Sequence, residues 1–349
     1  MRTRKGSKLL RSTIEIKGQT CICNSTEKTE LMRLFVNHPT RCFMIEEIAD
    51  EAGLAPERIK DVLDALRAER LRFDQLSVLG VLYQPDESRL HPDMIGARLS
   101  TQWWGKRIYF GDEFTSTIDI AKALPDDANL HGSLVAANMQ TQGRGRHGSH
   151  WISRKGKDIL LTFVLKAGAW HPSPSLLSLY ASIAVARVLD TAYQLPIQIK
   201  WPNDLFIQNR KVGGVMVEQD ASRDCYMVSL GLNVHSRYSD WPDECRETAI
   251  SLSLEKGFEW QRDLLIAQCG NTWEFLWDLM QQDQGETIRN YWNQYSGTLN
   301  KTVSLQLQGK EMTGVVKELN ADGLLILEDR SGSIFELIPE HVKLLRVVE

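Results

Sequence analysis

The chain has 349 residues, more than one compact core usually supports, so its length predicts two or three domains. Hydrophobic residues make up 42% of the chain and charged residues 25%, which is typical of folded globular proteins and excludes the disordered and fibrous classes. The formal net charge of −4 excludes a global electrostatic attraction to DNA, so a role with nucleic acid would need a local basic patch.

The cysteines and the apolar runs indicate where the protein resides. The six cysteines lack the CxxC spacing and partner histidines of a structural zinc site, which predicts free thiols. Cys21 and Cys23 are the only close pair, and incidental thiols are favoured there over a metal site. No apolar run approaches the roughly 20 residues that span a bilayer, and the basic start lacks the apolar stretch of a secretory signal. We therefore expect a cytoplasmic protein without a membrane partner.

Residues 1–28 are expected to form a basic flexible arm. They contain seven Lys or Arg against two Glu, few large apolar residues and no hydrophobic period. A solvated tail is the favoured interpretation.

The sequence pattern of residues 29–84 predicts a helix-turn-helix with a wing. Apolar residues recur with a helical period in three short segments, and Gly53 and Pro56 are placed to end the second helix and begin the third. The apolar stretch 78–83 is expected to add a wing strand.

The charges of the third helix leave its role open. A helix that reads DNA presents donors and positive charge to phosphates and base edges. Here acidic and basic residues balance one another: Glu57, Asp61, Asp64 and Glu69 against Arg58, Lys60, Arg67 and Arg70. Counterion release would be weak unless the basic arm contributes. A packing or regulatory module is therefore favoured over a DNA reader.

Residues 85–106 contain two prolines and are expected to be a linker with room for one helical segment. The next domain spans 107–297. Strands are expected at 134–139, 159–166, 197–200, 212–218 and 226–234, and helices at 176–189, 261–280 and 287–295. Strands on both sides of a long helix indicate an α+β layer.

Residues 298–349 show a third pattern, with short strands near 303–307, 314–318, 324–328 and 334–337. Glycine and asparagine occupy the turns between them. This spacing predicts a small antiparallel barrel.

A loop of alternating glycine and cationic residues, GRGRHG from Gly143 to Gly148, directly follows a predicted strand. Glycine allows close approach of the backbone to a ligand, and arginine offers forked donors that suit carboxylate and phosphate. The glycine spacing is neither that of a Walker loop nor that of a dinucleotide fingerprint. An anion-binding loop is favoured over a plain surface loop.

A second segment, KWPNDL from Lys200 to Leu205, is followed by Lys211 and by Gly213 and Gly214. A lysine and an aspartate within a strand-turn-strand unit must pair or meet a ligand, because isolated buried charge is costly. Pro-Asn-Asp is also ordinary turn chemistry. The adjacent lysine and glycines favour a functional role over a structural one.

These two motifs, in this order and at this separation, resemble those of the biotin protein ligase family. With the helix-turn-helix in front, the layout is similar to the family's bifunctional bacterial form, which is both biotin ligase and biotin operon repressor. The resemblance implies an α+β protein with an N-terminal winged helix-turn-helix, a central mixed-sheet α/β catalytic domain of the biotin/lipoate ligase type and a C-terminal SH3-like β-barrel.

The resemblance also implies the site residues. Biotin would be bound by a set of residues on three segments: Ser116, Thr117, Ile118, Gln140, Arg144, Gly145, Arg146 and Lys211. ATP or the adenylate would be bound by Arg144, Arg146, Trp151, Asn203 and Asn233. The chain departs from the family pattern at three positions, Ile118 for asparagine, Ser149 for arginine and Ser229 for glycine. No metal ligand is assigned.

The implied reaction joins biotin and AMP in a mixed anhydride and then transfers biotin to a lysine. The implied cofactors are ATP and Mg²⁺. Arg144, Arg146 and Lys211, together with Mg²⁺, would neutralise the charge that builds on the α-phosphoryl group, a task of positioning and electrostatics. Asp204 is the candidate for orienting or deprotonating the acceptor amine, whose reference pKa is about 10.4.

The implied acceptor is a biotin carboxyl carrier protein or the carrier domain of acetyl-CoA carboxylase. Operator DNA and a second copy of the chain stay open as further partners. Three alternatives remain: a lipoate-type protein ligase, a repressor that binds biotinoyl-AMP chiefly as a signal, and RNA binding by the arginine loop. Only Trp151 is near that loop to stack on a base, which disfavours RNA binding.

Overall fold

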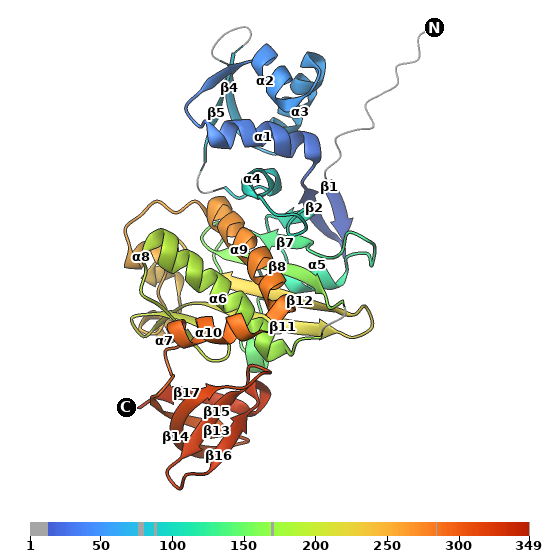
Figure 1. Cartoon of the computed structure of the whole chain (residues 1–349). Helices are drawn as coiled ribbons and strands as arrows, with labels where there is room; N and C mark the ends of the chain where they lie inside the picture. The colour runs from blue at the N-terminus through green and yellow to red at the C-terminus, as the bar shows by residue number, and fades with distance from the viewer. Residues whose placement is uncertain (1–12, 76–79, 87–88, 169–170, 284, 349) are drawn as a thin grey trace.

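The computed structural model describes residues 13–75, 80–86, 89–168, 171–283 and 285–348. These residues form an N-terminal unit of helices, a central sheet covered by helices and a C-terminal unit of strands, arranged one after another along the long axis of the molecule (Figure 1). The predicted α+β class with a mixed central sheet is confirmed.

The N-terminal unit holds three helices on a small sheet. Its elements are α1 (Thr26–Asn37), β3 (Cys42–Met44), α2 (Ile45–Ala52), α3 (Pro56–Ala68), β4 (Arg72–Gln75) and β5 (Gly80–Gln84), with the strand order β3-β5-β4. Gly53 ends α2 in the left-handed region at φ 64°, and Pro56 is the first residue of α3. Leu31, Phe35 and Ile48 lie in the core that the helices share. Residues 76–79, where the predicted wing strand begins, lie outside the described residues.

The expectation of a flexible arm is wrong for residues 13–28. Strands β1 (Thr13–Ile16) and β2 (Gln19–Cys23) form a hairpin, and β2 pairs with β6 (Ile108–Gly111) at the edge of the central sheet. Ile16 and Cys21 are buried beside Tyr109. A count of charges cannot foresee this order, because the edge of a sheet offers unpaired backbone groups to any strand of suitable length. Residues 1–12 lie outside the described residues.

The central sheet has nine strands in the order β1-β2-β6-β7-β8-β12-β11-β10-β9. Only β6 and β7 are parallel; the other neighbours are antiparallel. The strands not yet located are β7 (Leu134–Ala137), β8 (Ile159–Lys166), β9 (Ile197–Lys200), β10 (Asp204–Ile207), β11 (Arg210–Asp220) and β12 (Cys225–Leu232).

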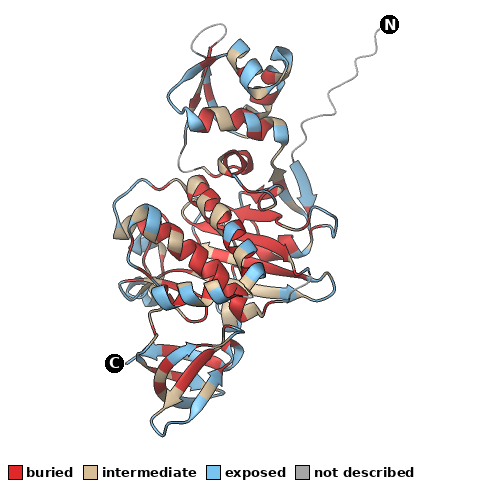
Figure 2. Cartoon of the chain, in the orientation of Figure 1, coloured by how far each residue is buried: buried red, intermediate tan, exposed pale blue. Residues whose placement is uncertain are grey.

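Side chains alternate between the two faces of this sheet, as the strand period of two requires. On β12, Tyr226, Val228 and Leu230 face the core beneath the long helices α6 (Pro174–Tyr193) and α9 (Arg262–Asp283). Cys225 and Met227 face the other side, where the short helix α5 (Thr117–Lys122) packs. Figure 2 shows the buried middle of the sheet and of α6. The remaining helices are α7 (Asp243–Arg246), α8 (Leu252–Glu255) and α10 (Glu286–Tyr295).

Helix α6 corrects one expectation about apolar runs. It is the one helix of the described residues that is long and apolar enough to cross a membrane by length and composition. However, 78% of its apolar window is buried inside the protein, as expected for a core helix packed on a sheet.

Residues 85–106, predicted to be a linker with room for one helical segment, are closely packed between the two units that they join. They contain helix α4 (Pro92–Arg98), which packs against α1 on one side and α9 on the other. Ile95 has no exposed surface, and Arg98 donates to Asp263 of α9 at 2.6 Å. The segment therefore fastens the N-terminal unit to the central domain.

The C-terminal unit is a five-stranded antiparallel sheet in the order β16-β15-β14-β13-β17. Its strands are β13 (Thr302–Leu307), β14 (Lys310–Leu319), β15 (Leu325–Asp329), β16 (Ile334–Leu337) and β17 (Val342–Val347), of which the sequence did not predict the last. The turn at Gly323 lies against helix α6, and the Trp201 indole donates to the Gly323 carbonyl at 3.0 Å. This contact brings the unit to the tryptophan of the KWPND segment.

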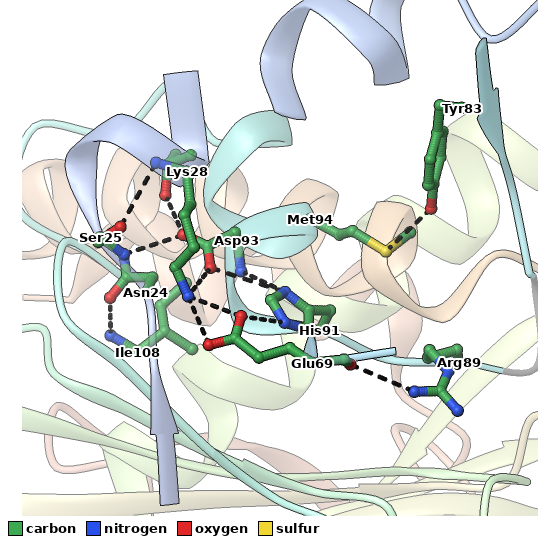
Figure 3. A network of polar contacts seen from close by, with 11 residues as sticks. Asn24, Ser25, Lys28, Glu69, Tyr83, Arg89, His91, Asp93, Met94 and Ile108 are labelled. Carbon is green, nitrogen blue, oxygen red and sulfur yellow. Dashed lines mark hydrogen bonds and ion pairs between the residues drawn. The ribbon is translucent and has the colours of Figure 1, made fainter. Parts of the chain in front are cut away.

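A buried group of charges joins the N-terminal unit to α4 (Figure 3). The Lys28 ammonium, with no exposed surface, lies 2.7 Å from Glu69 Oε2 and 3.2 Å from Asp93 Oδ2. His91 Nε2 lies 3.1 Å from the same Glu69 oxygen. Asp93 Oδ1 accepts from the Ser25 backbone N–H at 2.9 Å. Lys28 and Ser25 belong to the start of α1, Glu69 follows α3, and Asp93 lies in α4, so one cluster ties three elements.

Replacing Lys28 by Met should lower the free energy of unfolding by about 3–5 kcal/mol, because Glu69 and Asp93 would be left as buried carboxylates without their cation. Urea unfolding measures the loss. Arg67→Met is the matched control, since Arg67 is a partly exposed partner of Asp64 and its pair should contribute less than about 1 kcal/mol. Equal losses for the two variants would contradict the assignment of Lys28.

Candidate functional site

A cavity of about 600 Å³ opens between the central sheet and the C-terminal unit. It is bounded by the arginine-glycine loop, the turn between β9 and β10, the start of β11 and parts of β12 and β17. All of the predicted site residues except Asn233 line it: Ser116, Thr117, Ile118, Gln140, Arg144, Gly145, Arg146, Trp151, Asn203, Asp204 and Lys211.

The charge of the lining identifies the kind of ligand that the cavity suits. Its cationic side chains come from Arg144, Arg146, Lys200, Lys211 and Lys343. Asp204 is the only carboxylate among the described residues of the lining. Such an excess of positive charge in a concave site favours anionic ligands.

The arginine-glycine loop folds back on itself as a tight hairpin. The Gly145 N–H donates to the Ser149 carbonyl at 2.8 Å, and the Trp151 N–H donates to the Gly143 carbonyl at 2.9 Å. A Cβ atom on Gly145 would lie 2.4 Å from Ser149 Oγ, so the fold of the loop requires glycine there.

Ser149, where the family pattern has arginine, has a structural task in this loop. Its hydroxyl donates to the Arg146 carbonyl at 2.8 Å, which closes the turn around His147. His147 is in the left-handed region at φ 54° and Gly148 follows at φ 75°. The departure at Ser149 therefore removes one cation and adds one closing hydrogen bond.

The two arginines of the loop are held differently. Arg144 is partly exposed and pairs with Asp119 of α5 at 2.6 Å. Arg146 donates to Asn203 Oδ1 at 3.2 Å and to the Pro339 carbonyl of the C-terminal unit at 2.7 Å. Burial lowers the pKa of the Arg146 guanidinium, while the negative charges of Glu340 and Asp204 oppose this effect. Arg146 remains a cation at neutral pH because its ordinary pKa is far above 7.

Lys211 and Asp204 form an ion pair at 2.6 Å in the middle of the cavity. Both side chains are partly exposed, and the ammonium lies 5.9 Å from the centre of the Trp151 ring. Burial lowers the pKa of the nearby Lys200, and the positive charge of Lys211 adds to this effect, whereas Asp204 opposes it. The predicted grouping of Lys211, Asp204 and the KWPND segment is therefore found in three dimensions.

Gly231 explains how Trp151 reaches the sheet. A Cβ atom on this glycine of β12 would lie 2.5 Å from the Trp151 ring, so the ring packs directly on the strand backbone. The Trp151 indole N–H is buried and has no hydrogen-bond partner among the described residues. A buried donor of this kind favours a ligand with an acceptor beside the ring.

The polar wall opposite the cations is built around Gln140. Its Oε1 atom accepts from the Thr117 backbone N–H at 2.7 Å and from the Thr117 hydroxyl at 3.0 Å. The Thr117 hydroxyl lies 2.8 Å from Thr162 Oγ1, which lies 2.9 Å from Ser229 Oγ. Ser116 caps helix α5 through its backbone carbonyl, and the side chain of Ile118 is almost wholly buried.

Asn233 is placed behind the cavity. Its amide donates to the Ile250 carbonyl at 3.0 Å and to the Lys211 carbonyl at 3.5 Å. Asn233 thus supports the strand that carries Lys211. Its position favours this structural role over direct contact with a ligand in the cavity.

Metal ligands are sparse among the described residues. Their only group of three or more clustered metal-binding side chains is Glu69, His91 and Asp93, and the Lys28 ammonium lies within hydrogen-bond distance of the carboxylates there. A cation site in that place would compete with a buried lysine. Burial raises the pKa of Cys21 to about 12 and that of Cys23 to about 11, so both are neutral thiols at pH 7 and poor metal ligands.

Several contributors to the site were not foreseen from the sequence. The C-terminal unit supplies Val342, Lys343 and Leu345 to the lining and the Pro339 carbonyl to Arg146. Gln19, the first residue of β2, also contributes. Its side-chain oxygen Oε1 accepts a hydrogen bond from the Thr115 backbone N–H at 2.8 Å, next to Ser116. These contacts join segments far apart in the chain and have no local sequence signal.

Comparison with known proteins finds a family model that matches part of the central domain. Residues 110–235 match the biotin/lipoate A/B protein ligase family. The chain is 25% identical over 311 residues to the bifunctional ligase/repressor BirA of Bacillus subtilis (strain 168), an alignment that covers 88% of this chain and 96% of that protein. The bifunctional ligase/repressor BirA of Escherichia coli (strain K12) is 26% identical over 187 residues, which cover 53% of this chain and 58% of that protein.

Among solved structures, a biotin protein ligase from Aquifex aeolicus in complex with biotin and ATP is similar with a TM-score of 0.61 and 24% identity. The similarity covers 69% of this chain and 99% of that chain. It confirms the predicted biotin ligase fold of the central domain.

Replacing Gly145 by Ala should open the arginine-glycine loop, because the new methyl group would collide with Ser149 Oγ. We expect faster tryptic cleavage after Arg144 and Arg146, measured by mass spectrometry under native conditions. The double variant Gly145→Ala/Ser149→Gly should return toward the cleavage rate of Ser149→Gly alone, since it removes the colliding atom. Unchanged cleavage in Gly145→Ala would show that the loop yields without cost.

Proposed function

We propose that this chain is an ATP-dependent biotin–protein ligase, because its residues 110–235 match the biotin/lipoate A/B protein ligase family. It activates biotin to biotinoyl-5′-AMP and transfers biotin to a lysine of a carrier protein. The observation that carries the proposal is the convergence of Arg144, Arg146 and Lys211 with the polar wall of Gln140 and Thr117 in one cavity.

Activation requires two anions to react. A carboxylate oxygen of biotin attacks the α-phosphorus of ATP, a phosphorus–oxygen bond forms to biotin, and pyrophosphate leaves. The protein's contribution is to hold both anions and to neutralise the charge that builds on the α-phosphoryl oxygens. Arg146 and Lys211 are placed for this task, one on each side of the turn that carries Asn203 and Asp204. Little further conformational freedom is lost when the substrates bind, because Asn203 already orients the Arg146 side chain and Asp204 already orients the Lys211 side chain.

The cavity divides between the two substrates. Biotin is assigned to Ser116, Thr117, Ile118, Gln140, Gly145 and Lys211, with Arg144 and Arg146 at its carboxylate. The adenylate is assigned to the same arginines, to Trp151 and to Asn203. The orphaned indole N–H of Trp151 supports a ligand acceptor beside it. Asn233 takes part through Lys211, whose strand it holds.

Mg²⁺ bound with ATP would supply further positive charge at the phosphates. Since Asp204 is the only carboxylate among the described lining residues, we expect the phosphate oxygens and water to supply most of the metal ligands. The protein side chains then supply the remaining charge neutralisation.

In the second step the acceptor lysine attacks the carbonyl carbon of the mixed anhydride, an amide bond forms, and AMP leaves. The amine must first lose its proton, and Asp204, the only carboxylate found in the described part of the lining, is placed to orient the amine or accept the proton. Its ion pair with Lys211 would have to open as the amine approaches. The proposed acceptor is a biotin carboxyl carrier protein or the carrier domain of acetyl-CoA carboxylase, and the proposed location is the cytoplasm.

A lipoate-type ligase would use the same acyl-adenylate chemistry. ATP–pyrophosphate exchange that depends on biotin and not on lipoate separates the two activities. The decisive experiment is transfer of labelled biotin to a carrier domain in the presence of ATP and Mg²⁺; failure of transfer at saturating substrates would refute the proposed ligase.

Replacing Lys211 by Ala should lower biotin-dependent pyrophosphate exchange by roughly 100- to 1000-fold, because a cation aimed at the developing charge is lost. Lys317→Ala is the matched control: Lys317 is a partly exposed lysine paired with Glu328 in the C-terminal unit. The assignment of Lys211 would not survive normal exchange in its variant.

The N-terminal unit supports a second function, biotin-responsive repression. We propose that α2 and α3 form a helix-turn-helix with β4 and β5 as its wing, and that the five C-terminal strands form an SH3-like barrel. The turn from Gly53 to Pro56 favours the first assignment. The partners under this proposal are operator DNA and a second copy of the chain. Arg58 and Arg67, however, are paired with carboxylates, which leaves few free cations on α3.

Selection from a random-sequence DNA pool with the full-length chain tests repression. A DNA reader should enrich a two-fold symmetric sequence and bind it with an affinity that falls steeply as salt is raised. Enrichment of no sequence at low salt would leave the N-terminal unit with a packing role.

A further inference from the structure

Three hydroxyl groups form a line beneath the cavity, on three different elements. Thr117 begins helix α5, Thr162 lies in the middle of strand β8, and Ser229 lies opposite Thr162 on strand β12. The distances between successive oxygen atoms are 2.8 and 2.9 Å, so both contacts are hydrogen bonds. Thr162 has no exposed surface, while Ser229 reaches the cavity lining.

The direction of this line is decided at its Gln140 end. The Thr117 backbone N–H, which can only donate, lies 2.7 Å from one side-chain atom of Gln140, so that atom must be the amide oxygen. The same oxygen can only accept, and the Thr117 hydroxyl, 3.0 Å away, must donate to it. The single proton of the Thr117 hydroxyl is therefore used in the hydrogen bond to Gln140.

The other two hydroxyls follow in turn. Thr162 must donate its proton to Thr117, because the Thr117 oxygen has only lone pairs left to offer. Ser229 must then donate to Thr162 for the same reason. Every proton in the line points toward Gln140, so Ser229 presents only lone pairs to the cavity and acts there as an acceptor.

The place of Ser229 in the cavity matches the uncharged end of the proposed substrate. Two residues further along β12 is Gly231, on which the Trp151 ring packs beside Lys211. Two residues of antiparallel strand span about 6.8 Å. That separation is comparable to the valeryl chain of biotin, which links the carboxylate to the tetrahydrothiophene ring, and the ureido ring is fused to the far side of that ring. With the carboxylate at the cations, the ureido N–H groups come near Ser229.

We propose that Ser229 accepts a hydrogen bond from one ureido N–H of biotin and is a specificity-determining residue of this ligase, with Thr117 and Thr162 as positioning residues that orient its hydroxyl. The inference rests on the proposed biotin ligase function. It gives the serine that replaces glycine a chemical role: an acceptor turned toward the substrate selects a ring that carries N–H groups.

The test uses the full-length chain and two analogues of biotin, each with one ureido N–H replaced by oxygen. For one analogue, wild-type protein should bind roughly 10- to 100-fold more weakly than it binds biotin, because two acceptors would face each other. The other analogue should lose less binding affinity relative to biotin. Isothermal titration calorimetry gives the dissociation constants.

Two variants separate a role in recognition from a merely structural one. Ser229→Ala should raise the KM for biotin in pyrophosphate exchange about 3- to 10-fold with kcat unchanged, and should erase the difference between the two analogues. Thr162→Val should also reduce that difference, because the Ser229 proton becomes free to turn into the cavity, and Thr162→Ser should restore it. Ser304→Ala, on a strand of the C-terminal unit, is the control.

The proposal is overturned if wild-type protein binds both analogues as tightly as biotin, or if Ser229→Ala discriminates between them as wild-type protein does. Wild-type protein that transfers lipoate and not biotin would overturn the proposed function and this inference together. Normal biotin transfer with no effect of Ser229→Ala on KM or on discrimination would overturn the inference alone.

Discussion

The pairing of strand β8 with β7 and β12 is the constraint on which the rest of the structure depends. Its register sets Thr162 opposite both Val135 and Ser229, and the alternation of side chains sends one face of each strand into the core beneath α6. The other face packs against α5 and reaches the lining of the cavity at Ser229 and Gly231 of β12. If the pairing of β8 with β7 or with β12 shifted by one residue, the hydroxyl groups would turn into the apolar core and Phe163 would turn to the opposite face. Such a shift would destabilise the fold, because polar groups would be buried and apolar contacts would be lost.

Loops at the ends of these strands bring the reactive groups together. The segment after β7 carries Gln140 and the arginine-glycine loop, and the turn after β9 carries Asn203 and Asp204. Lys211 is the second residue of β11, the strand that follows β10. Three of the cations then have an oriented partner: Asp119 for Arg144, Asn203 for Arg146 and Asp204 for Lys211. Charge is therefore positioned before a substrate arrives, and this preorganisation is what electrostatic catalysis of adenylation requires.

The terminal units complete the cavity and connect it to the remainder of the chain. The C-terminal unit contributes the Pro339 carbonyl that holds Arg146, so its docking through Trp201 and Gly323 also orients a proposed catalytic residue. At the other end, Gln19 of the N-terminal hairpin bonds Thr115, and the same hairpin leads through Asn24 into α1 and the Lys28 cluster. The segment that carries Thr115 and Ser116 and the proposed DNA-binding unit are thus connected through one hairpin.

The sequence by itself determined the α+β class, the order of the three units, most strands and long helices of the central domain, and the two motifs that bear the chemistry. These follow from local signals: hydrophobic period, glycine and proline at turns, and cations among glycines. Tertiary structure alone decided that residues 13–23 form a hairpin of two strands, that α4 packs against both α1 and α9, that Asn233 is not part of the cavity lining, and that Ser149 and Ser229 bond Arg146 and Thr162. The physical reason is that backbone pairing at a sheet edge and hydrogen bonds between distant segments depend on partners that no local window contains.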